Sequence, residues 1–223
     1  QLIGATLLVY LFSKRNFTVG ATYSKTETVQ TALFGFLILG DTLSASASVG
    51  IALSLVGVMV LSIAAGRLSA RNLLTAWTGR AAIIGLGIGT GYGIAVVCYR
   101  AASLALESSD FLVRAAVTLV FAILMQTACM GCFLLFRDQE ELLQVAKSWR
   151  VGFLSGLAGA LGSACWFSAY TLQNAAYVSA LGQIELVFSF AASVFLFRER
   201  TNLIEVSGIG LVIFGLLILV LGL

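Results

Sequence analysis

Seven long apolar runs, separated by short polar breaks, dominate the sequence. A helix needs about 20 consecutive apolar residues to cross a bilayer. The chain is 60% apolar and only 10% charged, whereas a soluble domain carries about 25% charged residues. The sequence therefore predicts an all-α, polytopic membrane helix bundle, the lipid bilayer being its first partner. The seven full spans are 17–39, 43–65, 81–101, 111–136, 151–172, 175–197 and 203–223, and a partial span covers 1–12.

The composition argues against several classes of protein. The net charge of +3 is small and dispersed, so it does not indicate a nucleic-acid partner. There is no histidine, and the CxxC motif of Cys129 and Cys132 lies inside an apolar run without a second pair, so we expect neither a metal site nor a cofactor. No nucleophile and base are arranged as an enzyme requires. Proline is absent too, so we expect any helix break to come from one of the 23 glycines.

Two breaks between the apolar runs are longer than the others. Residues 66–80 are basic and are expected to join two halves of the protein, 1–65 and 81–223. Residues 137–150 have amphipathic spacing and contain Trp149, which predicts a short helix at the level of the lipid headgroups. The first run is too short for a span, so we expect the chain to begin part-way through a helix.

Two rare intramembrane carboxylates indicate an internal repeat. Glu27 lies near the middle of run 17–39 and Glu185 near the middle of run 175–197, where a carboxylate costs about 2.5–3.5 kcal/mol on insertion scales. A shift of 158 residues superposes both glutamates and the boundaries of their runs. An odd number of helices separates the copies, which predicts that they are inverted, as in many transporters. Other superposed pairs are Asn16 with Asn174, Gly50 with Gly208, and Gly57 with Gly215.

The basic residues of the breaks fall mostly on one side of the predicted membrane. When the spans are counted by alternation, the other side receives only Arg100 and Arg114, offset by Glu107 and Asp110. Cytoplasmic loops carry an excess of Lys and Arg, so we expect the basic side to face the cytoplasm, in a cell (inner) membrane. Its ten residues are Lys14, Arg15, Arg67, Arg71, Arg80, Arg137, Lys147, Arg150, Arg198 and Arg200.

Two segments resemble the last two helices of a repeat of the EamA family, in the drug/metabolite transporter superfamily. They are FTVGATYSKTETVQTALFGFLILGDTLSASASVGIALSLVGVMVLS and YVSALGQIELVFSFAASVFLFRERTNLIEVSGIGLVIFGLLIL. Each has a helix interrupted by polar residues and an acidic turn, Gly40-Asp41 or Arg198-Glu199. Each continues with a helix that opens with Gly50 or Gly208.

This resemblance implies ten helices in two inverted five-helix repeats. The first repeat is then incomplete, ending at residue 65, because about two helices and part of a third are missing at the front. The second repeat is expected at 81–223. The resemblance implies small-molecule transport and names no substrate. One feature departs from the family, whose members are usually drawn with both ends in the cytoplasm, because the charges place residue 223 outside.

A polar stripe around Glu27 is the first candidate site. On a helical wheel Tyr23, Ser24, Gln30 and Thr31 fall within about 60° of Glu27. Lipid cannot satisfy such a stripe, so it is expected to face a cavity or other helices. One hypothesis is a site for a substrate or a proton. The alternative is a carboxylate bound to neighbouring hydroxyls that only holds helices together.

The remaining candidate residues are on other helix faces or in other runs. Glu185 has a thinner polar stripe, and Lys25 points away from Glu27. Lys25 is expected to be the counter-ion of Glu185, to bind an anionic substrate, or to pair with a backbone carbonyl or another acid; its repeat equivalent is Gln183. Gly85, Gly89 and Gly93 are spaced for close helix contact, and Gly152, Gly156, Gly159 and Gly162 are expected to form a second such face. Aromatic residues expected to stack on a substrate, or else to pack, are Trp166, Tyr170 and Tyr92.

The sequence thus favours a transporter that moves a small organic metabolite or drug by alternating access, with proton coupling through the intramembrane glutamates as a further hypothesis. The alternative is a membrane scaffold or receptor that binds a partner through its helix faces. The sequence does not determine the substrate, the direction of transport, the coupling ion or the oligomeric state.

Overall fold

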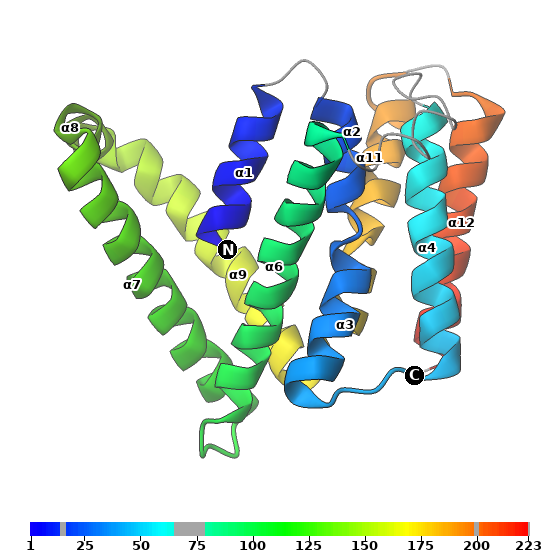
Figure 1. Ribbon diagram of the computed structural model, residues 1–223, viewed down its shortest axis with the longest axis horizontal. Helices are drawn as coiled ribbons and strands as arrows, with labels where there is room; N and C mark the ends of the chain where they lie inside the picture. The colour runs from blue at the N-terminus through cyan, green and yellow to red at the C-terminus, as the bar shows by residue number, and fades with distance from the viewer. Residues whose placement is uncertain (14–16, 65–78, 199–200, 223) are drawn as a thin grey trace. The chain divides into compact units, whose positions relative to one another are not determined.

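The computed structural model describes residues 1–13, 17–64, 79–198 and 201–222. The chain forms two compact units. Unit 1 comprises Gln1–Val97 and Asn174–Leu223, and unit 2 comprises Cys98–Gln173. All regular structure in the described residues is helical, as predicted (Figure 1). The joining segment expected at 66–80 lies almost entirely outside the described residues, as do five of the ten basic residues assigned to the cytoplasmic side.

Unit 1 contains eight helical segments in its described part. They are α1 (Leu2–Phe12), α2 (Phe17–Ser24), α3 (Glu27–Leu39), α4 (Ala45–Ala64), the first part of α6 (Arg80–Leu104), α10 (Ala175–Gly182), α11 (Ile184–Phe195) and α12 (Leu203–Leu221).

Six helical segments in the described residues are long and apolar enough to cross a membrane. Each lies within one of the predicted runs or exceeds it by a few residues. The seventh predicted span, 17–39, differs: it is divided into α2 and α3, and each part alone is too short to span. The six spans are α4, α6, α7, the Gly152–Leu172 part of α9, Ala175–Phe195 (α10 with α11) and α12.

The division between α2 and α3 does not come from a glycine, which corrects the expectation from the composition. The N–H groups of Lys25 and Thr26 bond to carbonyls three residues earlier, at 3.2 and 3.1 Å, instead of four. The hydroxyls of Ser24 and Thr26 also donate to carbonyls three residues back, at 2.8 and 2.6 Å. Such back-bonding competes with the helical hydrogen bonds and bends helices. Hydrogen bonds from small polar side chains to nearby carbonyls therefore account for the interruption between α2 and α3.

The most extensive contact in unit 1 joins α4 and α12, which run side by side (Figure 1). A Cβ atom added to Gly50 would lie 2.6 Å from the carbonyl oxygen of Gly215, and one added to Gly57 would lie 2.8 Å from that of Gly208. Residue numbers rise along one helix as they fall along the other, so the helices are antiparallel. Glycines allow this approach because a β-carbon would collide with the opposite backbone.

Two buried clusters extend this contact. The first joins α4, α10 and α12 and consists of Ala47, Ile51, Ala176, Tyr177, Ala180 and Leu219. The second consists of Val58, Val212 and Leu216, and the partly buried Leu186 and Val187 of α11 pack against it. The α4–α12 pair therefore supports the broken helices α10 and α11 along one side.

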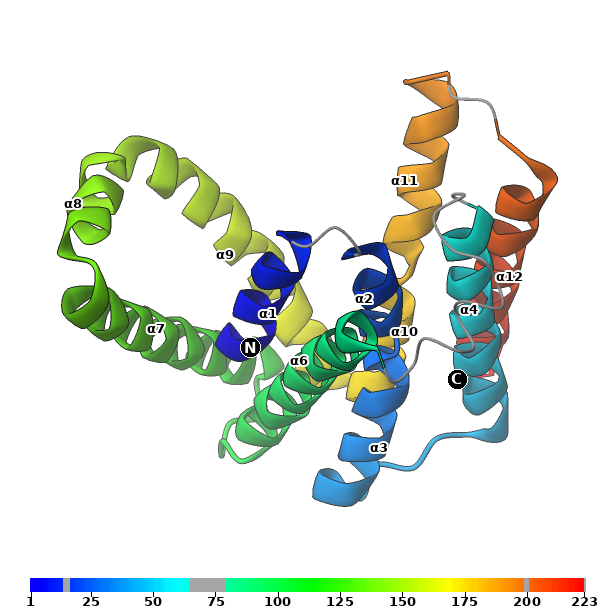
Figure 2. The same cartoon turned by 45° about the horizontal axis from the view of Figure 1, so that its top comes forward.

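Unit 2 contains the last part of α6, then α7 (Phe111–Arg137), α8 (Gln139–Lys147) and α9 (Trp149–Leu172). The short helix predicted within 137–150 is present as α8, which connects α7 to α9 (Figure 2). Phe167 packs with Ala115 and Leu119 in a small buried cluster, and its ring lies 4.6 Å from that of Tyr99. The second glycine face, from Gly152 to Gly162, differs from expectation because an added Cβ meets no described atom of its own unit within 4 Å.

Arg100 fastens the end of α6 to the end of α9. Its Nη1 donates to the carbonyl oxygens of Tyr170 at 2.9 Å and Gln173 at 2.5 Å, where the negative end of the helix dipole favours a cation. We expect Arg100→Met to lower the stability of the protein by about 1.5–3 kcal/mol, the range for hydrogen bonds to charged groups. Thermal unfolding in detergent would measure this. Arg150→Met, which changes an exposed arginine, is the control; equal losses in both variants would contradict the assignment.

Candidate functional site

The two broken helices place both intramembrane glutamates at equivalent positions. Glu27 lies in the first turn of α3, and Glu185 lies in the first turn of α11. Acidic side chains are stabilised at a helix N-terminus by its partial positive charge. Neither helix start has a side-chain cap: the residues before them, Thr26 and Gln183, make no capping hydrogen bond.

Lys25 and Glu185 form an ion pair between the two broken helices. Nζ of Lys25 donates to Oε1 of Glu185 at 2.6 Å, across 160 residues of sequence. This confirms the first of the alternatives that the sequence left open for Lys25. The side chains are 32% and 64% exposed, respectively. Glu185 is therefore less buried than its position in the middle of an apolar run suggested.

Glu27 is half-buried and has a different environment. In the described part of the chain its carboxylate accepts no hydrogen bond, yet it interacts electrostatically with Lys25, Glu185 and Tyr92. A half-buried carboxylate without a direct partner is costly at this depth. Glu27 is therefore the least satisfied charged group among the described residues of this site.

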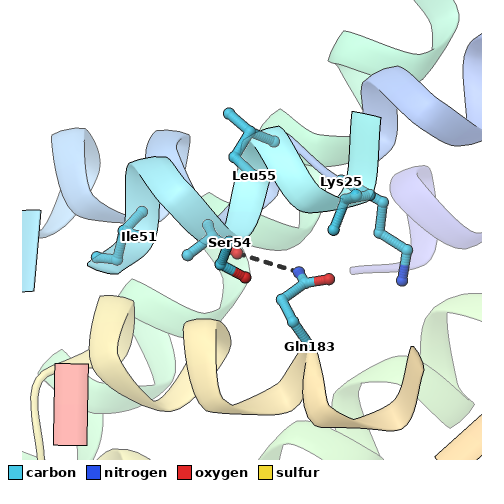
Figure 3. A pocket seen from close by; sticks show the side chains of 7 residues that line it. Lys25, Ile51, Ser54, Leu55 and Gln183 are labelled. Carbon is cyan, nitrogen blue, oxygen red and sulfur yellow. Dashed lines mark hydrogen bonds between the residues drawn. The ribbon is translucent and has the colours of Figure 1, made fainter. Parts of the chain in front are cut away.

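A cavity of about 10 Å³ is lined by Lys25 together with residues of α3, of α4 and of the break between α10 and α11. This is space for about one water molecule. Nε2 of Gln183 donates to the Thr28 hydroxyl at 3.3 Å, while Oε1 of Gln183 and the hydroxyl of Ser54 have no hydrogen-bond partner. Figure 3 shows Ser54 and Gln183 pointing toward each other across this space. Its lining residues are Lys25, Thr28, Ile51, Ser54, Leu55, Val58 and Gln183.

Ser54 is a site residue that the sequence did not reveal. It is only 2% exposed and lies on α4, within a long apolar run. A single serine in such a run is ordinary, because its hydroxyl can bond to the carbonyl one turn back. Its unpartnered oxygen beside Gln183 became apparent only from the packing of α4 against the breaks.

The rest of the predicted polar stripe makes hydrogen bonds to α6, through Gln30, and to its own helical segments. Gln30 accepts a 2.6 Å hydrogen bond from Thr90 of α6, and its amide donates to Thr26 at 2.9 Å. Ser24 bonds to its own helix, and the Tyr23 carbonyl receives both donors of Thr26. Thr31 is fully buried, and its hydroxyl has no hydrogen-bond partner.

The glycine face predicted on α6 packs against the break between α2 and α3. An added Cβ on Gly89 would lie 3.2 Å from the amide nitrogen of Glu27, and one on Gly93 would lie 3.1 Å from the Thr31 hydroxyl oxygen. Gly85 is similarly close to the backbone of Gly20. The close approach predicted from this spacing is confirmed, and it brings Tyr92 on the same helix near Glu27.

Trp166 and Tyr170 belong to unit 2, whereas the other nine predicted site residues belong to unit 1. Their rings stack with centroids 5.8 Å apart. Tyr170 is 7% exposed and Trp166 is 43% exposed, so Trp166 is the member of the pair available to a ligand.

The six helices that are long and apolar enough to span a bilayer define a multi-pass membrane protein. The sequence matches the EamA-like transporter family over residues 79–221. Because this match covers more than half of the chain, the chain belongs to the EamA-like transporter family, as its sequence suggested, and not to an enzyme family. Comparison with curated proteins found no significant match.

Proposed function

We propose that this protein moves a small organic metabolite or drug across the membrane by alternating access. Membership of a family of transporters supports this function. The observation that carries the proposal is the discontinuity of two helices at mid-span, with a glutamate directly after each break. Broken helices expose backbone groups that lipid cannot satisfy, so they occur where a membrane protein has a binding site or a water-filled cavity.

We further propose that residues 1–65 and 81–223 belong to two inverted repeats of the kind that contain five helices each. A shift of 158 residues superposes α2 on α10, since Phe17–Ser24 becomes 175–182. The same shift converts the contact of Gly50 with Gly215 into that of Gly208 with Gly57. It also converts the contact of Gly50 with Leu219 into that of Gly208 with Leu61. Contacts that exchange in this way are those expected of a two-fold axis between α4 and α12, and they support the inverted repeat.

In this proposal the substrate or a proton binds around Glu27, Lys25, Gln183 and Glu185, close to the proposed two-fold axis. Tyr92 contributes to the same site. Trp166 and Tyr170, in unit 2, remain predicted aromatic contacts for a substrate. Tyr23, Ser24, Gln30 and Thr31 are the further polar residues proposed for this site; Ser24 and Gln30 also shape the break through their hydrogen bonds to Ala21 and Thr90. The basic breaks face the cytoplasm of a cell (inner) membrane in this proposal, on the strength of their charge.

Exchange between the two sides of a vesicle membrane tests the proposal. The natural full-length protein is reconstituted, and the vesicles are loaded with a panel of unlabelled metabolites before addition of each labelled counterpart. An alternating-access carrier should accelerate entry of its labelled substrate when that substrate is present inside. A membrane scaffold or receptor, the alternative function, should give no flux for any compound. Absence of exchange throughout a broad panel, with correctly inserted protein, would reject transport.

A further inference from the structure

We propose that Lys25 is the binding site for a carboxylate group of the substrate, and that Glu185 occupies this site in its absence. The inference deepens the proposed function by assigning a chemical class to the ligand. It rests on the ion pair between Lys25 and Glu185, the cavity that Lys25 lines, and the buried Ser54 hydroxyl in the wall of that cavity.

The ion pair itself has the features of an exchangeable contact. The Lys25 ammonium is the only cationic side chain in the described part of the cavity wall, and it bonds to one oxygen of Glu185. The Glu185 side chain is 64% exposed, so the surrounding helices of the described structure leave it room to move away from Lys25. A second carboxylate can then take the place of Glu185 on the Lys25 ammonium.

The cavity offers further donors to such a ligand. The Ser54 hydroxyl is 2% exposed and has no partner, so its proton is available to an anion. The Thr28 hydroxyl can both donate and accept. The amide of Gln183 can therefore rotate by 180°, keep its bond to Thr28, and present its NH₂ group to the cavity in place of Oε1. Lys25, Ser54 and Gln183 would then surround one carboxylate with three donors.

The charges of the site favour displacement of Glu185 by the ligand over binding of the ligand in addition to Glu185. The positive charge of Lys25 lies near two carboxylates, Glu27 and Glu185. Glu27 interacts electrostatically with both of the other groups. An extra anion would therefore raise the negative charge of the site, which is unfavourable between helices. If the ligand displaces Glu185, the charge beside Lys25 stays constant. The group that leaves is a carboxylate, so the geometry of the contact selects a carboxylate in its place.

The size of the cavity agrees with displacement of Glu185 before the ligand group binds. About 10 Å³ accommodates one water molecule, not a carboxylate in addition to the present side chains. The ligand group can enter only as the Lys25–Glu185 contact opens. In this structure Glu185 holds the Lys25 ammonium in the position that the substrate would use.

Calorimetric titration of the natural full-length protein in lipid nanodiscs tests the exchange. The probes are acetate, its neutral counterpart acetamide, and tetramethylammonium, all at constant ionic strength. Wild type should bind acetate in preference to the other two. Glu185→Gln removes the competing carboxylate, so acetate should bind at least about tenfold more tightly, as expected when a charged hydrogen bond to Lys25 no longer has to be broken. Lys25→Gln should weaken acetate binding at least about tenfold, as expected for loss of a charged hydrogen bond, and Lys25→Arg should restore most of it.

Weaker acetate binding by Glu185→Gln, or wild-type binding by Lys25→Gln, would overturn the proposal. So would equal binding of acetate and acetamide by wild type. The Glu185→Gln and Lys25→Arg variants keep the result informative if Lys25→Gln fails to fold. Because the measurement is of binding, it is independent of flux. A protein that binds acetate in this pattern and moves no compound would retain the carboxylate site and lose the transport function.

Discussion

Transport by the Glu27→Gln variant is expected to fall to the level of protein-free vesicles. Glu27 is half-buried, accepts no hydrogen bond among the described residues, and lies where two other charges and Tyr92 act on it. Such a carboxylate persists in a membrane protein when it binds a proton or a ligand in the working cycle. The amide has the same shape and cannot carry the charge. Vesicle uptake of the identified substrate, measured at several pH values, checks the effect.

The Glu27→Gln substitution should lower transport without lowering the stability of the folded protein. A neutral amide is less costly than a carboxylate in a low-dielectric site, so Glu27→Gln should unfold at the wild-type temperature or above it. Glu107→Gln, which alters an exposed glutamate between α6 and α7, is the control and should leave both properties unchanged. Full, pH-dependent transport by Glu27→Gln would remove Glu27 from the mechanism.

Substitution of Gly215 by leucine is expected to separate α4 from α12. An added Cβ would lie 2.7 Å from both the carbonyl oxygen of Gly50 and the amide nitrogen of Ser54. Since the obstacle is backbone, no side chain can rotate away to relieve the collision. Overpacking of this kind costs about 1–3 kcal/mol, occasionally more. Unfolding by heat or by denaturing detergent, with the protein in mild micelles, would measure the loss.

Gly210→Leu provides a closely matched control for this prediction. Gly210 lies on the same helix, is exposed, and has no atom within 4 Å of an added Cβ. Both substitutions raise intrinsic helix propensity by about the same amount, up to ~1 kcal/mol. The difference between them therefore isolates the contact with α4. Equal stability of the two variants would show that the α4–α12 approach does not hold the protein together.

The positions of the spans could be predicted from the sequence because lipid makes strict demands on length and polarity. The runs at 45–64 and 203–221 were recognisable from apolar length alone. The small-residue face of Gly85, Gly89 and Gly93 was recognisable from helical spacing. The residues that pack against this glycine face could not be predicted, because helical spacing identifies a face and gives no information about its partner.

The break between α2 and α3 could not be derived from a search for proline or glycine. It depends on hydroxyls of Ser24 and Thr26 that bond to nearby carbonyls, and such serines and threonines also occur in continuous helices. The same ambiguity applies to Ser54, whose hydroxyl matters only because α4 brings it to the cavity beside Gln183.

By itself the sequence determined that this chain is a bundle of membrane helices with two carboxylates near mid-span, since the cost of placing polar groups in lipid leaves few alternatives. Tertiary structure alone decided that Lys25 joins Glu185, 160 residues away, while Glu27 has no such bond to any residue that the structure describes. The reason is physical: wheel positions fix directions within one helix, whereas pairing across helices depends on how closely glycine-lined backbones approach and where each helix breaks.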